Sequence, residues 1–152
     1  MTMGLSHVGI AVKDLEASIS FYRAAFALEV LVRRPFGGAL YERILAIPGV
    51  RGQVALLRRE TLQVELFEFN VISRSTSPHE RAVSECGISH FCIEVADIEA
   101  VYERALASGA VFHCPPLDFG EARATYGRDP DGNVFELWQS TRVHAAKGPG
   151  RA

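Results

Sequence analysis

The sequence has little that would direct the chain to a membrane, to nucleic acid or into the secretory pathway. No apolar run approaches the roughly 20 residues that a membrane-spanning helix needs. The net charge is −2, and the 16 Lys and Arg residues are scattered rather than clustered. A strand-like pattern begins by residue 6, so we expect no signal peptide. We therefore expect a cytoplasmic protein that binds neither membranes nor nucleic acid.

Cysteine is also scarce. The chain has three cysteines, an odd number, and no two of them are spaced as CxxC: Cys86, Cys92 and Cys114. This pattern argues against a disulfide framework or a zinc knuckle and favours free thiols in a reducing compartment. The 152 residues are 48% hydrophobic and 22% charged, which is ordinary for a globular protein. The chain is long enough for one core, or for two half-domains that share one.

What the sequence does contain is an internal repeat. The stretch SHVGIAVKDLEASIS, from Ser6, matches SHFCIEVADIEAVYE, from Ser89, with seven identities at fixed spacing. Such self-similarity indicates that the same structural unit folds twice.

Each copy of the repeat predicts a strand followed by a helix. The strands alternate apolar and other residues, and an Asp follows each of them, Asp14 and Asp97. Asp is a favoured N-cap, and apolar residues spaced by three and four predict amphipathic helices over residues 15–26 and 98–109. Gly109 is placed to close the second helix.

The rest of each half predicts further strands, rich in β-branched and aromatic residues and separated by turns. Each half therefore has the order strand, helix, then about three strands, which predicts an α+β fold. We expect modules at 1–70 and 88–141, a linker at 71–87, a flexible tail at 142–152, and a hairpin turn at DPDGN rather than a calcium loop. The additional strands are predicted over residues 28–34, 39–47, 53–59, 62–69, 110–114, 121–128 and 133–139.

Four polar residues occupy equivalent positions in the two halves. His7 and His90 lie on the less hydrophobic faces of the first strands, and Glu65 and Glu136 interrupt the last apolar strand of each half. A carboxylate in such a strand is costly unless it is paired or bound to a cation. Two imidazoles and two carboxylates suit a divalent ion such as Ni, Co, Mn, Zn or Fe. The aromatic side chains expected to share the face of the glutamates, and to line a pocket, are Phe67, Phe69 and Trp138.

Two stretches, HVGIAVKDLEASISFY and YGRDPDGNVFEL, resemble the vicinal oxygen chelate superfamily, the glyoxalase/bleomycin-resistance/dioxygenase proteins. The resemblance covers roughly residues 5–140. It implies two βαβββ modules that form a cupped, incomplete β-barrel around one divalent metal ion, with His7, Glu65, His90 and Glu136 as ligands. It also implies a homodimer and a small-molecule substrate with vicinal oxygens.

Two branches of the superfamily are nearest. The four-ligand set resembles bacterial glyoxalase I, but Ala11 stands where that enzyme has the Arg that helps to bind glutathione. The first half resembles methylmalonyl-CoA epimerase, and by that resemblance Glu42 matches its catalytic glutamate. The segment RDPDGN replaces the HPK-type segment of the epimerase.

The resemblance implies a metal-dependent lyase or isomerase that transfers a proton next to a metal-chelated carbonyl, through an enolate or enediolate. Glu136 or Glu42 would carry the proton, and Arg123 would hold a substrate anion. Tyr41 and Tyr126 are further candidates for an acid or base. The aromatic pocket indicates a substrate with an apolar or aromatic portion.

Two other functions remain open: an extradiol-type ring-cleaving dioxygenase, and a non-catalytic protein that binds a small molecule such as an antibiotic and confers resistance to it. The sequence also leaves open whether the two modules pair within one chain or across a dimer.

Overall fold

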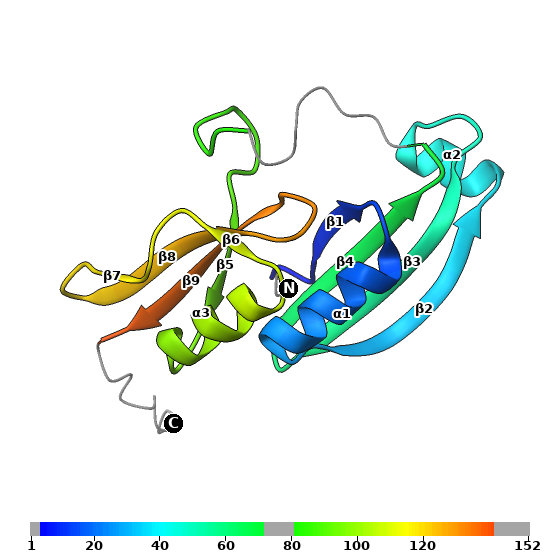
Figure 1. The fold of residues 1–152 in the computed structure, drawn as a ribbon. Coiled ribbons are helices and arrows are strands. Elements are labelled where there is room, and N and C mark those ends of the chain that lie inside the picture. The colour runs from blue at the N-terminus through cyan, green and yellow to red at the C-terminus, as the bar shows by residue number, and fades with distance from the viewer. Residues whose placement is uncertain (1–3, 72–80, 142–152) are drawn as a thin grey trace, which may run out of the picture.

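A computed structural model describes residues 4–71 and 81–141, which form two α+β modules packed together (Figure 1). The predicted linker lies partly, and the predicted tail wholly, outside these residues. No helix within the described ranges is long and apolar enough to cross a membrane. The first module comprises β1 (Val8–Val12), α1 (Leu15–Phe26), β2 (Glu29–Gly37), α2 (Ala39–Leu45), β3 (Arg51–Arg59) and β4 (Leu62–Phe69). The second comprises β5 (Phe91–Glu94), α3 (Ile98–Ala107), β6 (Val111–Phe112), β7 (Leu117–Asp118), β8 (Ala122–Arg128) and β9 (Val134–Ser140).

Each module contains one open sheet, and the two sheets have corresponding strand orders. The first is β1-β4-β3-β2 and the second is β5-β9-β8-β6, with β7 also paired to β8. In each sheet the first strand lies parallel to the last, and the other pairs are antiparallel. The predicted α+β class is therefore confirmed.

One predicted strand is wrong. Residues 39–47, ALYERILAI, contain the helix α2 instead of a strand. Ala, Leu, Glu and Arg are strong helix formers, and the apolar residues here fit a helical spacing as well as an alternating one. The helix begins after Gly38, at φ 84°, and ends at Ala46 in the left-handed conformation. In the second module, β6 is shorter than predicted and β7 is an additional short strand.

The start of each long helix is tied to the last strand of its own module. As predicted, Asp14 and Asp97 are the N-caps, and their carboxylates accept hydrogen bonds from helix backbone N–H groups at 3.0 and 3.1 Å. The first N–H of α1, at Leu15, also donates to the Glu68 carboxylate of β4 at 2.7 Å. The first N–H of α3 donates to Gln139 of β9 at 2.9 Å. Each helix is thereby fixed against the strand that carries a predicted metal ligand.

The two modules share one hydrophobic core, built where α1 packs against α3. Phe26 of α1 and Phe135 of β9 meet edge to face, with their ring centroids 5.2 Å apart. Leu66 and Leu137 belong to this core, so Glu65 and Glu136, one residue before them on the same strands, point to the opposite faces of the two sheets.

The turn between β8 and β9 adds polar contacts to this interface. Asp129 is 1% exposed and accepts a hydrogen bond of 2.9 Å from the Tyr22 hydroxyl of α1. Asn133 also donates to this carboxylate, and Asp131 accepts from the Lys13 backbone N–H at 3.1 Å. The DPDGN segment is therefore a turn, as predicted, and it also anchors one module to the other.

The Tyr22–Asp129 contact shifts the pKa of both groups. Burial, and then the neighbouring Asp129 charge, raise the pKa of Tyr22 well above its ordinary value. Burial raises the pKa of Asp129, although its hydrogen bonds from Asn133 and Tyr22 lower it in part. The tyrosine therefore stays protonated as the donor.

Replacing Tyr22 with Phe should lower the free energy of unfolding by about 1–3 kcal/mol at neutral pH, because Asp129 loses a buried donor. The pKa of Tyr22 is higher in the folded state, so its contribution to stability should be lost as pH rises above about 10. Urea denaturation of both proteins against pH measures this difference. Tyr102→Phe in α3, where the side chain is only half-buried, is the matched control, and an equal loss in both variants would contradict the assignment.

Candidate functional site

The four predicted metal ligands form two pairs, one in each module. The Nε2 atom of His7 lies 3.3 Å from Oε2 of Glu65, and Nε2 of His90 lies 3.2 Å from Oε2 of Glu136. The second pair is the less exposed, with side-chain exposures of 26% and 13% against 42% and 25% for the first. The structure thus brings each predicted histidine to its predicted glutamate.

Strand register explains why the pairs form. The first and last strands of each module are parallel, and Gly9 lies opposite Glu65 as Cys92 lies opposite Glu136. Each histidine precedes that position by two residues. Residues two apart on an extended chain point to the same side, so each imidazole reaches the carboxylate.

A serine holds each imidazole from its other side. The Ser89 Oγ lies 2.9 Å from Nδ1 of His90, and Ser6 Oγ lies 3.3 Å from Nδ1 of His7. A hydrogen-bond partner at Nδ1 leaves Nε2 as the nitrogen that faces the glutamate, which is the arrangement found around metal-binding histidines.

The two pairs do not meet within one chain. Among residues 4–71 and 81–141, no three His, Cys, Asp or Glu side chains converge as a group that could hold a metal ion. The modules contact each other through α1 and α3, and each pair belongs to a separate sheet. One chain therefore presents two half-sites, each with one imidazole and one carboxylate.

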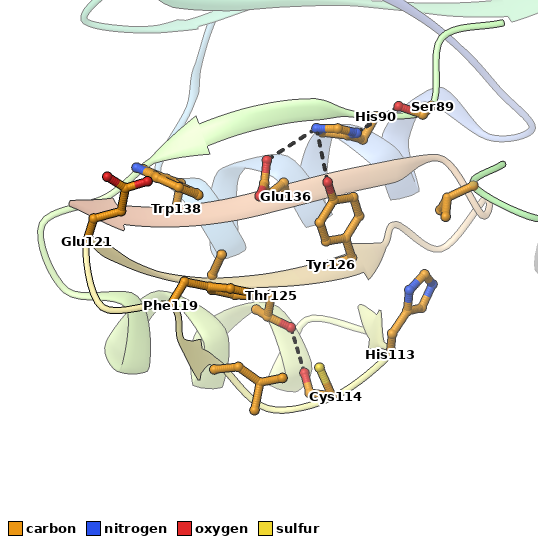
Figure 2. A pocket seen from close by; sticks show the side chains of 13 residues that line it. Ser89, His90, His113, Cys114, Phe119, Glu121, Thr125, Tyr126, Glu136 and Trp138 are labelled. Atoms are coloured by element: carbon orange, nitrogen blue, oxygen red, sulfur yellow. Dashed lines mark hydrogen bonds and ion pairs between the residues drawn. The ribbon is translucent and has the colours of Figure 1, made fainter. Parts of the chain in front are cut away.

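A cavity of about 690 Å³ opens beside the pair in the second module (Figure 2). Glu136 and Trp138 of β9 lie on one face of the sheet, and Tyr126 of β8 is opposite Glu136 in the register. The Tyr126 hydroxyl is 3.4 Å from Nε2 of His90, and the two rings meet edge to face. The lining residues are Val83, Ser89, His90, His113, Cys114, Leu117, Phe119, Glu121, Ala124, Thr125, Tyr126, Glu136 and Trp138.

The predicted pocket residues separate into two groups. Trp138 lines the cavity as expected. Phe67 and Phe69 lie on the sheet of the first module, where their rings stack at 5.4 Å and both pack against Phe36. They share a face with Glu65, but they belong to a small aromatic core around Phe36, against which Tyr41 of α2 also packs.

Arg123 and Glu42 are not close to the His90–Glu136 pair. Arg123 forms an ion pair with Glu99 of α3, on the helix-covered side of the sheet, and it does not line the cavity. Residues 123 and 126 of one strand point to opposite faces, and this corrects the expectation that Arg123 reaches the pocket. Glu42 is half-exposed on α2, in the first module.

The cavity also contains residues that the sequence did not single out. Leu117, Phe119 and His113 come from the segment between α3 and β8. Leu117 and Phe119 lie outside every predicted strand, so no periodic pattern predicts which way their side chains point. Of the two tyrosines considered as acid or base, Tyr126 is in the site. Tyr41 instead accepts a hydrogen bond of 2.6 Å from Arg34 in the first module.

The surroundings of Glu136 hold two neighbouring groups in their protonated forms. Loss of water contact, then the charge and hydrogen bond of Glu136, and then the charge of Glu94, raise the pKa of Cys92 to about 12, although its side chain still reaches solvent. Burial, followed by Glu136 and Cys92, raises the pKa of Tyr126. Both groups therefore remain neutral beside the carboxylate at neutral pH.

Cys92 should therefore react slowly with iodoacetamide at pH 8 despite its exposure, since the thiolate is the reactive form. In metal-free protein, Glu136→Gln should lower the pKa of Cys92 and speed the reaction. Mass spectrometry of the alkylated peptides over a pH series measures both, with the exposed Cys86 as the internal standard. An unchanged Cys92 profile in the variant would contradict the role of the Glu136 charge.

Comparison with known proteins places this geometry in a family. The Glyoxalase/Bleomycin resistance protein/Dioxygenase superfamily matches residues 4–137. None of the curated protein sequences matches the chain.

Several solved structures share the fold. A glyoxalase family protein from Bacillus cereus has a TM-score of 0.81 at 20% identity, over 92% of this chain and 95% of that one. The fosfomycin resistance protein FosX from Listeria monocytogenes has a TM-score of 0.63 at 21% identity, over 93% and 96%. A Glu-to-Gln mutant of FosX, complexed with Mn(II) and 1S,2S-dihydroxypropylphosphonic acid, has a TM-score of 0.58 at 21% identity, over 90% of each chain.

The repeated module, the corresponding sheets and the match across residues 4–137 agree with one another. The chain belongs to the Glyoxalase/Bleomycin resistance protein/Dioxygenase superfamily.

Proposed function

We propose that the protein is a divalent-metal-dependent lyase or isomerase that moves a proton at the carbon next to a carbonyl, in a small substrate with vicinal oxygens. One observation carries this proposal: the two His–Glu pairs, with Nε2–Oε2 distances of 3.3 and 3.2 Å, occupy equivalent places in the two modules. A matched pair of N,O half-sites is difficult to explain by packing alone, because each Glu interrupts an apolar strand.

The donor chemistry of the pairs fits a divalent ion, whereas their separation in one chain does not fit a four-ligand site. His7, Glu65, His90 and Glu136 would hold the ion when the two half-sites are brought together. The FosX mutant with Mn(II) supports a divalent ion in this fold, and Ni, Co, Mn, Zn and Fe all match the donor set. When bound, such an ion supplies a Lewis acid that stabilises negative charge on a substrate oxygen.

A second copy of the chain would bring the half-sites together. β1 and β5 are terminal strands of their sheets, so each has an edge that pairs with no strand among the described residues. Leu5 and Ile88, two residues before the histidines and equivalent in the repeat, are 84% and 79% exposed. Apolar side chains beside free strand edges favour pairing with another chain. In the proposed homodimer, β1 of one copy approaches β5 of the other, twice by symmetry.

The proton carrier of the proposal is Glu136, with Glu42 as a second carboxylate. Glu136 lines the cavity and is 13% exposed, so a substrate held there contacts it with little water present. The neutral Cys92 and Tyr126 beside it limit the number of charges near the carboxylate. Glu42 would act from α2 of the other module, and the proposed dimer is what would bring that module to the cavity.

The pairing of half-sites is tested by mixing variants. His7→Ala and His90→Ala homodimers should each lose the metal, of which the wild type should hold about one equivalent per chain. After unfolding and refolding together, mixed dimers should recover one intact site, which restores about a quarter of the wild-type metal content for a random mixture. Mass spectrometry of metal content measures the recovery. If metal bound within a single chain, mixing would restore none.

The proton-transfer roles are tested by isosteric substitution. Glu136→Gln should slow solvent-deuterium exchange at the carbon next to the carbonyl by about 10²–10⁴-fold, the usual contribution of a positioned acid or base. Proton NMR in D₂O with a panel of α-hydroxycarbonyl compounds measures this rate. Glu42→Gln is assayed in parallel, and Glu103→Gln on α3 is the control. A wild-type rate in Glu42→Gln would remove Glu42 from the mechanism, and a wild-type rate in Glu136→Gln would overturn the mechanism itself.

A further inference from the structure

Aromatic side chains surround the cavity of the second module. Figure 2 shows the rings of Trp138, Tyr126, Phe119 and His113 around it, supplied by β9, β8 and the segment before β8. The imidazole of His113 lies nearly parallel to the ring of Tyr126, with centroids 6.4 Å apart. Aromatic rings attract one another at offset-stacked and edge-to-face contacts. The cavity therefore offers several surfaces that favour a flat partner.

Phe119 is unusual among these residues because it is 64% exposed. Its position is nevertheless fixed. The Phe119 N–H donates to the Ala122 carbonyl at 2.8 Å, and the next N–H, at Gly120, donates to the Asp118 carboxylate at 2.6 Å. The Thr141 hydroxyl donates to the Gly120 carbonyl at 3.0 Å. A ring held in water at the side of a cavity gains apolar contact when a ligand enters.

The charges of the residues that line the cavity indicate that it does not favour an anionic ligand. Among the described residues, the carboxylates of the lining are Glu121 and Glu136, and the lining includes no Lys or Arg. Arg123 of β8 is directed to the other face, where it pairs with Glu99. In the metal-free protein, an anion moved from water into this cavity loses hydration, meets two carboxylates and gains no Lys or Arg partner from the lining.

The volume of the cavity agrees with a small molecule. At about 690 Å³ it lies within the range of roughly 300–1,000 Å³ that is usual for ligand pockets. One end contains the His90–Glu136 pair, and the apolar residues Leu117 and Phe119 belong to a different segment of the lining. The site therefore combines a polar group with apolar walls.

We infer that the part of the substrate that enters this cavity is an uncharged, planar aromatic group, which contacts Phe119 and Trp138. This inference rests on the proposed function, since the oxygen-bearing part of the substrate is directed to His90 and Glu136. It adds the substrate class: a neutral aromatic carbonyl or hydroxycarbonyl compound, rather than a phosphonate, a phosphate ester or another small anion.

The chain contains a single tryptophan, Trp138, so its fluorescence reports directly on this cavity. Metal-free protein is titrated with 4-nitrobenzyl alcohol, with 4-nitrobenzylphosphonate, which has the same ring and a charged group, and with propylphosphonate, which has no ring. Saturable quenching by the neutral compound is expected, with affinity for its phosphonate counterpart lower by about tenfold or more. Equal or tighter binding of either phosphonate would overturn the inference.

Variants identify the binding surface. Phe119→Ala should weaken binding of 4-nitrobenzyl alcohol by about fivefold, the value of one aromatic contact, and Phe119→Tyr should retain most of the affinity. Val111→Ala is the control, because Val111 is also exposed, at 54%, but does not line the cavity. Thermal melting establishes that each variant is folded. Unchanged affinity in Phe119→Ala, or equal losses in both alanine variants, would exclude the proposed contact.

The outcome is independent of the metal. Because the titration uses metal-free protein, neutral aromatic binding without any metal uptake would remove the proposed lyase or isomerase, while the preference of the cavity for a neutral aromatic ligand would stand. Metal uptake together with phosphonate binding would keep the proposed lyase or isomerase and overturn the preference for a neutral aromatic ligand.

Discussion

The arrangement of the whole molecule depends on the contact between the β8–β9 turn and α1. Asp129 is almost fully buried, and the Tyr22 hydroxyl is one of the donors that make its burial tolerable. Because Tyr22 belongs to one module and Asp129 to the other, this hydrogen bond and the surrounding apolar core fix the two modules through their helices. The same packing directs the half-sites away from each other, so the joint between modules explains why one chain does not assemble four ligands.

The internal repeat extends to individual polar contacts. Both modules pair a serine with the histidine and the histidine with a glutamate, and both tie the start of a helix to the strand that carries this glutamate. The two halves differ in what surrounds these shared parts. The first has an aromatic core under α2, whereas the second has an open cavity. The proposed chemistry depends on the His–Glu pairs, which both modules have, and the inferred substrate preference depends on the cavity of the second module.

The sequence predicted the pairs because they depend on local rules: a repeat, the alternation of a strand, and one carboxylate in each apolar run. Arg123 could have been assigned correctly by the same alternation, since it is three residues from Tyr126 on one strand. The helix α2 and the position of Phe119 were beyond such rules. Residues 39–47 fit two periods equally well. Phe119 is placed by its own hydrogen bond to Ala122 and by those that the next residue, Gly120, makes with Asp118 and Thr141. The packing of the two modules against each other depends on the surfaces of α1 and α3, and the pattern of residues along a strand does not predict how these surfaces meet.

The hydrogen bonds from the first N–H of α1 and of α3 to β4 and β9 limit which insertions and deletions this chain tolerates. Glu65 and Glu68, like Glu136 and Gln139, are three residues apart and point to opposite faces, one to the half-site and one to a helix N-terminus. A single-residue insertion or deletion between the two members of either set would move one of them to the wrong face. An insertion or deletion within VELFE or FELWQ would therefore separate a half-site from the helix that its own strand fixes.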